Sequence, residues 1–377
     1  MTIPFDAVVV GGGVMGCTTA LFLARGGMRV ALIDRGLICR GASGVNAGTL
    51  TLHMTRAALI PYAMRGWQMW QAASEWLGHG VAARGTDGLC LAFTSAEAEM
   101  LEMRVQLRRA AGAPITLIST ARAKEIEPGL SPAVRLAAHC PIDGHAEAYR
   151  TGHAFRTALA TAGVRIVEGL AVRGVTVGGT GFDIHYGTQA TLATHRLILA
   201  GGAWLEEMLG WLGVHIPVKV LVNQLIVTER MAPVMRSVLT IANGLLSLKQ
   251  FDNGTVLLGG GWQGRRNRDN GMTDIIPANV IGNAQLARAV IPALGGARIL
   301  RIWLGLEAET ADALPMVGSV PGVSGAFVIG SVHSGYTSGP WIAQLLAEAI
   351  LERPPTMPLF DPARLIDSAT TTRNHSV

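Results

Sequence analysis

Three glycines near the start of the chain, Gly11, Gly13 and Gly16, form a G-x-G-x-x-G pattern. Glycine at these positions permits a tight turn, lets the backbone approach a pyrophosphate and lets a helix pack closely on a strand. The free N–H groups and the positive dipole at the start of that helix would bind the phosphates. Asp34 follows about 20 residues later, where its carboxylate can accept both hydroxyls of an adenosine ribose. An ordinary glycine-rich turn would not need the spaced acid, so the pattern predicts a dinucleotide site.

The elements around this pattern form a β-turn-α-turn-β unit. Apolar residues 5–10 predict a buried strand, residues 14–25 a helix and residues 28–33 a second strand. The uncharged run at 7–24 is long enough to resemble a membrane span. Asp6 precedes this run and glycines interrupt it, so we expect a buried strand and helix rather than a signal peptide or transmembrane segment.

The rest of the chain changes character towards its middle. Asn253-Gly254, between two apolar runs, predicts a β-hairpin. Helices are predicted at 57–77, 96–111, 151–162, 273–290 and 340–351. Further strands are predicted at 164–167, 172–177, 182–186, 197–199, 218–229, 244–251, 255–259, 298–304 and 327–329. The two ends of the chain therefore predict an α/β arrangement, and the middle predicts an antiparallel sheet with helices.

The composition limits the class of protein. The 377 residues suffice for two domains, and only 15% of them are charged. Two explanations stay open: a partner covers part of the surface, or the chain is simply rich in alanine, glycine and valine. The net charge of +5 comes from scattered arginines without a basic helix, so we expect no nucleic-acid partner. The four cysteines have no C-x-x-C or zinc-like spacing, which predicts a reducing compartment and no metal site.

Six segments in order along the chain resemble the D-amino acid oxidase family of flavoproteins. They are Val8–Gly16, Gly41–Gly48, Asp143–His145, Leu199–Trp204, Asp312–Gly318 and Gly330–Pro340. The resemblance implies FAD as the cofactor. A second, nicotinamide site would need another glycine-rich β-α unit, and the glycine turn at 199–203 lacks the full spacing. We therefore expect one FAD and no second dinucleotide.

The resemblance also implies how the flavin is held. Small residues from Ser43 to Gly48 would line the isoalloxazine and the pyrophosphate. Some relatives attach the flavin covalently through a histidine in this loop; Asn46 stands there, so we expect non-covalent FAD. Val172 would contact the adenine side through its backbone. The turn at 335–337 would direct helix N–H groups at the flavin N1–C2 edge, where reduction places negative charge. An ordinary helix cap is the alternative for this turn.

The residues predicted to bind FAD come from these motifs. They are Gly11, Gly13, Val14, Met15, Gly16, Asp34, Arg35, Ser43, Asn46, Ala47, Gly48, Val172, Gly201, Gly202, Trp204, Gly335, Tyr336 and Thr337.

The family's reaction transfers a hydride from the substrate α-carbon to flavin N5, and a neutral amine needs no dedicated base for this step. Many relatives that oxidise amino acids grip the substrate carboxylate with an arginine. Glu307 occupies the matching position here, so either another arginine binds the carboxylate or the substrate presents a cationic amine. The alternative for Glu307 is a structural role.

Three further residues are candidates for catalysis. His53 follows the flavin loop and could face the active site, or it could be a packed, hydrogen-bonded histidine. His333 lies beside the C-terminal turn. Lys249 lies in the Asn-Gly hairpin, where some oxidases place a lysine near N5 to activate oxygen; a solvent-facing lysine is the alternative.

The sequence thus predicts an α/β protein (α+β overall). A Rossmann-like FAD-binding domain of the glutathione-reductase type would comprise residues 1–80, 141–215 and 311–377. An antiparallel-sheet substrate domain would comprise residues 81–140 and 216–310. The predicted function is FAD-dependent oxidation of a small amine or imino acid, such as an opine, proline, hydroxyproline or a D-amino acid.

Several alternatives accompany this prediction. A dehydrogenase that passes electrons to a partner subunit is favoured over an oxidase of the glycine or sarcosine type that uses oxygen directly. The other rivals are a flavin subunit for electron transfer without substrate chemistry and an NAD-linked dehydrogenase. The expected location is the cytoplasm, where partners could hold the protein at the inner membrane.

Overall fold

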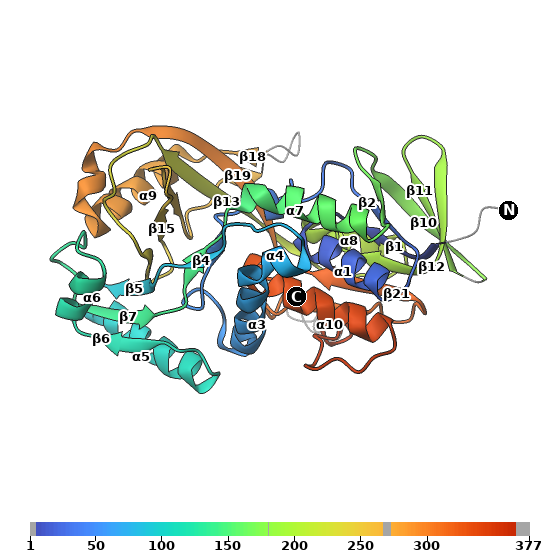
Figure 1. Ribbon diagram of the computed structural model, residues 1–377, viewed down its shortest axis with the longest axis horizontal. Helices are drawn as coiled ribbons and strands as arrows, with labels where there is room; N and C mark the ends of the chain where they lie inside the picture. The colour runs from blue at the N-terminus through green and yellow to red at the C-terminus, as the bar shows by residue number, and fades with distance from the viewer. Residues whose placement is uncertain (1–4, 180, 267–272, 367–377) are drawn as a thin grey trace, which may run out of the picture.

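The computed structural model describes residues 5–179, 181–266 and 273–366. Two eight-stranded sheets lie towards opposite ends of an elongated molecule (Figure 1). Within these described residues, no helix is long and apolar enough to cross a membrane.

The first sheet is built around five parallel strands in the order β9-β2-β1-β12-β21. Strands β10 and β11 extend β12 in antiparallel fashion, and β20 pairs antiparallel with β21. The bounds are β1 Phe5–Val10, β2 Val30–Ile33, β9 Arg165–Val167, β10 Val172–Gly178, β11 Gly181–Tyr186, β12 Ala190–Leu199, β20 Met316–Ser319 and β21 Ala326–Gly330.

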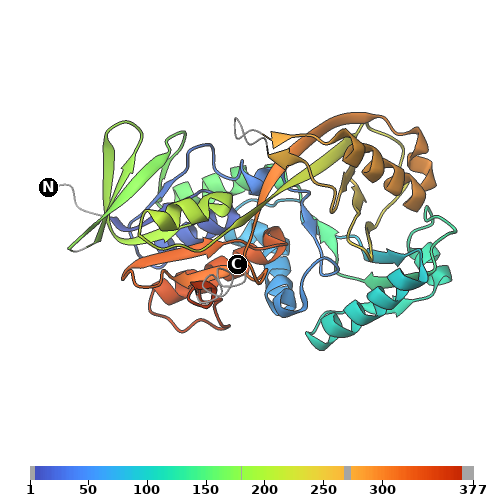
Figure 2. The ribbon, with the colours of Figure 1, turned by 180° about the vertical axis from the view of Figure 1, so that it is seen from behind.

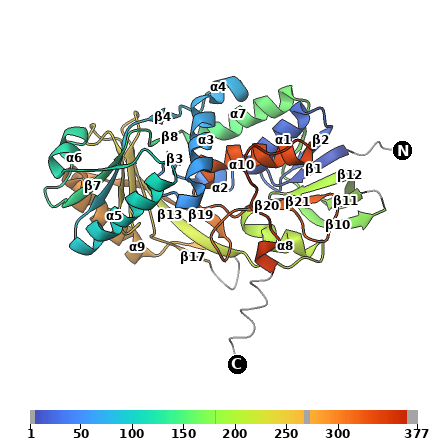
Figure 3. The same cartoon turned by 90° about the horizontal axis from the view of Figure 1, so that it is seen from below.

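Helices cover both faces of this sheet, which explains why its central strands are apolar throughout. Ala7 and Val9 belong to a core cluster shared with α1 (Val14–Arg25), α7 (Ala148–Thr161) and α10 (Gly335–Ile350). The alternate residues of β1, Val8 and Val10, belong to a second cluster. That cluster includes α8 (Leu205–Gly210), on the other face. Helices α1 and α10 lie side by side (Figures 1 and 3).

The second sheet has the order β19-β13-β16-β15-β14-β5-β7-β6. Adjacent strands are antiparallel except β14 and β5, which are parallel. The bounds are β5 Gly88–Ala92, β6 Thr116–Ile118, β7 Leu136–Cys140, β13 Lys219–Thr228, β14 Val238–Ile241, β15 Ser247–Gln250, β16 Val256–Gly259 and β19 Ile299–Glu309. The long strands β13 and β19 reach from this sheet towards the first (Figure 2).

The remaining elements join or cover the two sheets. Helix α5 (Ser95–Ala110) covers one face of the second sheet, while α6 (Thr120–Ile126) and α9 (Pro277–Val290) cover the other. The other elements are α2 Ala42–Val45, α3 Ile60–Gln71, α4 Ala73–Trp76, β3 Thr49–Leu50, β4 Arg84–Gly85, β8 Gly144–His145, β17 Arg265–Arg266 and β18 Thr273–Asp274. Strands β3, β8 and β4 form a small sheet between the two large ones.

The predicted fold class is confirmed, including the β-α-β unit at the start of the chain and the hairpins β10–β11 and β15–β16. Every strand of the first sheet lies within 1–80, 141–215 or 311–377, and every strand of the second lies within 81–140 or 216–310. The exact domain limits remain a prediction.

The last helix differs from its prediction. It begins at Gly335 rather than at Pro340, so the proline lies inside α10. Proline has no N–H to donate to the carbonyl four residues earlier, which belongs to Tyr336. The indole Nε1–H of Trp70 donates to that carbonyl instead, at 2.6 Å. A side chain from α3 thus replaces the missing backbone hydrogen bond, which lets the helix start close to the cavity described next.

Candidate active site

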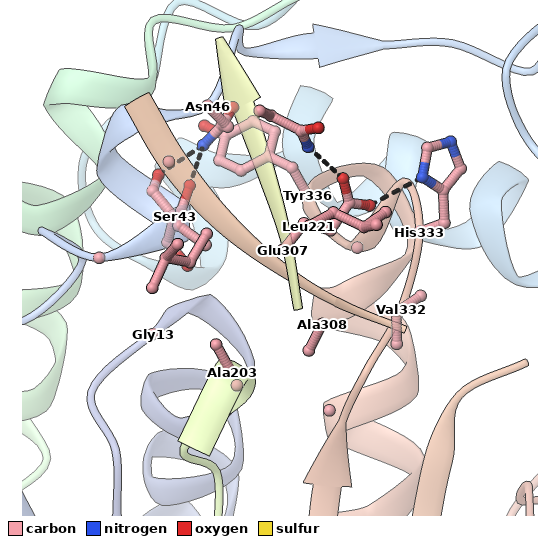
Figure 4. A pocket seen from close by; sticks show the side chains of 18 of the residues that line it. Gly13, Ser43, Asn46, Ala203, Leu221, Glu307, Ala308, Val332, His333 and Tyr336 are labelled. Carbon is pink, nitrogen blue, oxygen red and sulfur yellow. Dashed lines mark hydrogen bonds and ion pairs between the residues drawn. The ribbon is translucent and has the colours of Figure 1, made fainter. Parts of the chain in front are cut away.

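A cavity of about 1530 Å³ lies between the two sheets. Its walls come from the glycine turn before α1, the loop at 40–47, the turn before α10, and the facing strands β13, β14, β15 and β19 (Figure 4). Typical small-ligand pockets are roughly 300–1,000 Å³. The volume therefore suffices for a large cofactor together with a small substrate.

The glycine turn before α1 has the geometry that close approach to a ligand requires. Gly11 has φ +112°, and a Cβ there would lie 2.3 Å from the Ala200 carbonyl oxygen. A Cβ at Gly16 would lie 1.9 Å from the Gly11 carbonyl oxygen. Gly13 is the N-cap of α1 and offers no side chain to its first turn. The Ser43 hydroxyl accepts a hydrogen bond from the Val14 N–H at 2.9 Å, and the rest of this helix start lines the cavity, where its dipole suits an anion.

The adenosine end of the cavity is formed around Asp34. Its Oδ2 accepts a hydrogen bond from the Gly12 N–H at 2.6 Å, and its Oδ1 accepts one from the Gly36 N–H at 2.7 Å. Each carboxylate oxygen keeps a second lone pair for a ribose hydroxyl. The Arg35 guanidinium lies 3.5 Å from the centroid of the Trp204 ring. Val172, like the other residues of this group, lies on the cavity wall.

The loop at 42–48 is held by its own side chains and by the second sheet. Asn46 Nδ2 donates to the Ser43 carbonyl at 2.6 Å, and Asn46 Oδ1 accepts from the Gly48 N–H at 2.5 Å. The Trp303 indole, on β19, donates to the Val45 carbonyl at 2.8 Å. The loop is thus rigid, and the asparagine leaves no nucleophile at the position of the tethering histidine.

The start of α10 closes the opposite side of the cavity. Ser334, the N-cap, has φ +60°, and Gly335 and Tyr336 line the wall. The Tyr336 hydroxyl is 2.7 Å from Thr151 Oγ1. Thr337 lies behind the wall and donates to the Thr49 carbonyl at 3.2 Å. The helix start is therefore fixed by side chains on both sides.

The structure brings most of the predicted FAD-binding residues to this one cavity. The predicted residues on its wall are Gly11, Gly13, Val14, Met15, Gly16, Asp34, Arg35, Ser43, Asn46, Ala47, Val172, Gly201, Gly202, Trp204, Gly335 and Tyr336. Gly48 and Thr337 do not line it. A Cβ at Gly48 would lie 2.2 Å from the Ala146 carbonyl oxygen, so this glycine permits backbone packing behind the loop.

Three buried polar atoms on the wall have no hydrogen-bond partner within the described chain: Gln224 Nε2, Ser247 Oγ and Ser331 Oγ. Buried polar groups in native proteins are nearly always satisfied, so these atoms indicate a bound molecule or water. Together with the helix start and the cavity volume, they fit FAD and a substrate.

Glu307 and His333 form an ion pair on the wall of the cavity (Figure 4). His333 Nδ1 lies 2.7 Å from Glu307 Oε1, and the Asn223 amide donates to Glu307 Oε2. The hydrogen bond to Glu307 raises the pKa of His333 despite burial. Burial acts to raise the pKa of Glu307, but His333 and Asn223 outweigh it and the pKa is lowered. The pair therefore presents a charged carboxylate bound to an imidazolium.

The other two catalytic candidates have different positions. His53 is buried on the cavity wall, with Nε2 3.3 Å from the Gly88 carbonyl oxygen, and burial lowers its pKa. Lys249 does not line the cavity. The alternative prediction, a solvent-facing lysine, is wrong. Lys249 is only 1% exposed, and its ammonium donates to Thr49 Oγ1. Burial lowers the pKa of Lys249 to about 7.

Four arginines on the cavity wall were not among the predicted site residues: Arg40, Arg56, Arg104 and Arg108. Arg56 forms an ion pair with Glu309 at 2.8 Å. Arg104 and Arg108 come from α5, one helical turn apart. This i, i+4 spacing is visible in the sequence, but only the packing of α5 on the second sheet shows that both side chains reach the site.

Comparisons with known proteins agree with this geometry. Residues 6–349 match the family model described as FAD dependent oxidoreductase. The chain is 26% identical over 361 residues to a glycine oxidase of Geobacillus kaustophilus (strain HTA426), covering 93% of this chain and 94% of that protein. It is 27% identical over 361 residues to an opine oxidase subunit of Rhizobium meliloti, covering 92% and 93%.

Solved structures have the same fold. The crystal structure of glycine oxidase from Geobacillus kaustophilus aligns with a TM-score of 0.85 and 25% identity, covering 96% of this chain and 97% of that one. L-proline dehydrogenase from P. horikoshii aligns with a TM-score of 0.87 and 23% identity, covering 98% and 99%. The predicted family resemblance and the predicted FAD cofactor are thereby confirmed. The chain belongs to the family of FAD-dependent oxidoreductases.

Proposed function

We propose that this chain uses non-covalently bound FAD to oxidise a small secondary amine or imino acid. The observation that carries the proposal is the Glu307–His333 ion pair on the wall of the flavin cavity. The pair places no unpaired cation at this position to bind a substrate carboxylate, so the amine rather than the carboxylate would lie on this side of the cavity. Relatives named as oxidases of glycine and opines and a structural neighbour named as a proline dehydrogenase support a small amino acid as substrate, and the opine and proline names support a secondary amine.

When bound, FAD supplies the acceptor for a hydride from the carbon next to the amine nitrogen. The protein must deliver that amine in its neutral form. Glu307 Oε1 accepts from His333 Nδ1, which fixes the ring; once His333 has lost its proton at higher pH, its Nε2 can accept the proton of the substrate ammonium. The Asn223 amide holds the other oxygen of Glu307 and so fixes the carboxylate as well.

The start of α10 has a separate role. The Gly335 and Thr337 N–H groups donate to the Val332 and Ser334 carbonyls, so this helix start would act on the cavity at Gly335 and Tyr336 through its dipole and the Tyr336 N–H. Preorganised donors of this kind stabilise negative charge at no cost of reorganisation during the reaction. The bond from Trp70 to the Tyr336 carbonyl and the stacking of the two rings, with centroids 4.7 Å apart, keep this helix start in place.

Electron transfer to a partner protein is our proposal for the step that returns the flavin to its oxidised state. Two relatives are named as parts of larger enzymes, the opine oxidase subunit and the beta subunit of a sarcosine oxidase of Rhizobium meliloti (strain 1021). The low charged fraction of 15% fits a chain with a covered surface. The four cysteines are unpaired, which fits the proposed cytoplasmic location.

Direct use of oxygen is the second candidate, because the glycine oxidase relative matches over nearly its whole length. In that case Lys249 is our candidate for the group that promotes the reaction with oxygen, acting from behind Thr49. Peroxide formed on turnover without any added acceptor would select the oxidase. Turnover that needs an added artificial acceptor would select the dehydrogenase.

The proposed function is tested by anaerobic titration of the purified yellow protein with amino acids, imino acids, opines and simple amines. We expect the flavin absorbance to bleach with secondary amines, and acid precipitation to release the flavin into the supernatant. Failure of every amine to bleach the flavin would contradict the proposal and favour an electron-transfer role. A colourless protein that reduces NAD would replace the proposal altogether.

A further inference from the structure

We infer that Arg104 and Arg108 of α5, together with Ser247 of β15, form a carboxylate-binding subsite in the flavin cavity. This inference rests on the proposed function and narrows it. The substrate would be an amine that carries a carboxylate, such as an N-substituted or cyclic amino acid, rather than a simple alkylamine. The carboxylate would be held by α5, which packs on the second sheet. Many relatives instead use an arginine at the position of Glu307.

The first step of the argument is the position of α5. Thr94 and Glu97 form a capping box that fixes its first turn. Leu101 and Val105 are buried against the sheet. Arg104 and Arg108 project from the side of the helix next to this apolar stripe, and both line the cavity. The helix therefore presents two guanidinium groups to the cavity from a rigid support.

The second step is that both guanidinium groups are held but not neutralised. Arg108 Nε donates to the Thr55 carbonyl at 2.9 Å, and Arg104 Nη1 donates to the Ala242 carbonyl. A guanidinium has five N–H donors, so each bond leaves donors for a ligand. Neither arginine forms an ion pair with an acid of the described chain.

Several other charges near the cavity are compensated, although Arg35, Arg40 and Glu207 on its wall form no ion pair with a described residue. Glu307 pairs with His333, and Glu309 pairs with both Arg56 and Lys219. Asp143 is buried and accepts hydrogen bonds from Thr51 and the Leu52 N–H. Asp143 attracts Arg108 without forming an ion pair with it, so the two cations of α5 have one carboxylate between them, and an anionic group of the ligand would supply a second.

The third step is a polar row on the sheet that faces these arginines. Cys90, Thr240 and Ser247 are neighbours in register on β5, β14 and β15, so they share one face of the sheet. All three line the cavity. Ser247 is 4% exposed and its hydroxyl has no partner in the described chain. This buried donor beside the arginines is an independent indication of a polar ligand.

Two guanidinium groups and a hydroxyl suit a carboxylate. Arginine binds carboxylates through parallel N–H···O bonds, which are stronger than neutral hydrogen bonds. The Glu307–His333 pair on the other wall offers a carboxylate no unpaired cation, so the two ends of an amino acid would be sorted: the carboxylate towards α5 and the amine towards β19. This sorting places the amine-bearing carbon between two anchored ends.

The subsite is tested by ligand binding without turnover. Pyrrole-2-carboxylate cannot be dehydrogenated like an amine, and pyrrole-2-carboxamide is its neutral analogue of similar shape. Each compound is titrated into the yellow holoprotein, and the dissociation constant is read from the change in flavin absorbance. We expect the wild type to bind the carboxylate more tightly than the carboxamide, with a clearly lower dissociation constant. Equal binding of the two, or no binding of the carboxylate, would overturn the inference.

Variants assign the preference to residues. Arg104→Met and Arg108→Met should each weaken carboxylate binding by about 10- to 100-fold, which corresponds to a charged hydrogen bond of about 1.5–3 kcal/mol. Carboxamide binding should stay unchanged. Arg109→Met is the matched control, because Arg109 is exposed on the same helix and lies off the cavity wall. An equal loss for both ligands, or the same loss in the control, contradicts the inference.

If an arginine variant loses its flavin, Ser247→Ala serves instead, with an expected loss of about 3- to 10-fold for the carboxylate alone. The outcomes for the two proposals are separable. Arginine-dependent carboxylate binding in a protein that no amine bleaches would leave the subsite standing and remove the proposed function. If amino acids bleach the flavin but both arginine variants still prefer the carboxylate over the carboxamide, the proposed function stands and the subsite is contradicted.

Discussion

Single side chains divide the cavity into regions of opposite charge. Glu307 and His333 lie on β19 and on the turn before α10, whereas Arg104 and Arg108 lie on α5. The acidic group and the two arginines are far apart in the sequence. The substrate preference that we propose would therefore depend on packing that places this ion pair and the two arginines around the same space.

Glu307→Gln should weaken the binding of the amine and should also change the pH at which the bound amine loses its proton. Loss of the carboxylate removes a charged hydrogen bond of about 1.5–3 kcal/mol, so the rate of flavin reduction at low substrate should fall roughly 10- to 100-fold. Because Glu307 raises the pKa of His333, the variant should also lower that pKa. The pH at which His333 loses its proton should then move down in the pH profile of anaerobic flavin reduction.

Glu229→Gln is the control for this prediction, because Glu229 is an exposed acid just beyond the end of β13. It should leave both the rate and the pH profile unchanged. An unchanged profile in Glu307→Gln would show that the pair with His333 does not control ionisation at the site.

Lys249 should make stability depend on pH. Its pKa in the folded chain is about 7, whereas an unperturbed lysine has a pKa of about 10.4. Between these values the unfolded chain binds more protons, so the free energy of unfolding rises with pH from about 7 towards 10. The rise should amount to roughly 2–4 kcal/mol. Lys249→Met should abolish it and should be more stable than the wild type at pH 7.

Denaturant unfolding of the wild type and of Lys249→Met at pH 7 and pH 9.5 measures this difference. Lys124→Met, which removes an exposed lysine from α6, is the control. Parallel curves for the wild type and Lys249→Met across this range would show that the buried ammonium is not the source of the pH dependence.

At the scale of residues, the sequence was most informative where the signal is local. Gly11, Gly16 and Asp34 lie within one β-α-β unit, so their spacing alone predicted a dinucleotide site, and all three line the cavity. The burial of Lys249 could not be read from its hairpin, because β14 and β3 cover it from other parts of the chain. Arg104 and Arg108 were missed for the same reason. Only the tertiary packing of α5 distinguishes them from the exposed arginines of the same helix.

Among the elements, the contact of α3 with α10 decides where the second helix start lies. Gly66 is the point of closest approach, because a Cβ there would be 2.0 Å from the Thr337 carbonyl oxygen. The Trp70 indole reaches the Tyr336 carbonyl from the same helix. Helix α3 thus supports the part of α10 that faces the flavin.

Gly66→Ala should push α3 away from the start of α10. The clash involves backbone atoms, so we expect a loss of about 1–3 kcal/mol in stability and weaker retention of FAD. Gly210→Ala is the matched control: Gly210 is also helical, and no atom lies within 4 Å of its added Cβ. Thermal unfolding and the flavin-to-protein absorbance ratio report both effects. A wild-type melting temperature in Gly66→Ala would show that the helices can separate freely.

Helix and strand limits were predicted well where one pattern governs an element. The helix at 14–25 matches α1, and the strand at 218–229 differs from β13 by one residue at each end. Strands β5, β6, β7 and β14 were not predicted, because their short apolar runs gain a partner only from distant segments. The strand at 298–304 was too short, since β19 continues through Glu307 to Glu309 along its partner β13.

Across the whole molecule, the site is made from segments that are far apart in sequence. The first sheet takes strands from three separate parts of the chain, and β14 joins β5 across about 150 residues. Such pairing is set by the burial of both sheets rather than by local preference. This is why the sequence could give the family and the cofactor but not the arrangement of charges around the substrate.

Strand β19 touches two separate parts of the cofactor's surroundings. Trp303 donates to the Val45 carbonyl, Gly305 lies directly over Val45, and Glu307 reaches His333. During synthesis, the nucleotide motif leaves the ribosome long before this strand does. The N-terminal segment alone would form only one wall of the cavity. We expect the flavin to be enclosed only after residues 299–335 have been made and have packed against it. We therefore expect stable retention of FAD to require strand β19 and the turn before α10, and a chain that ends before residue 299 to lose the flavin.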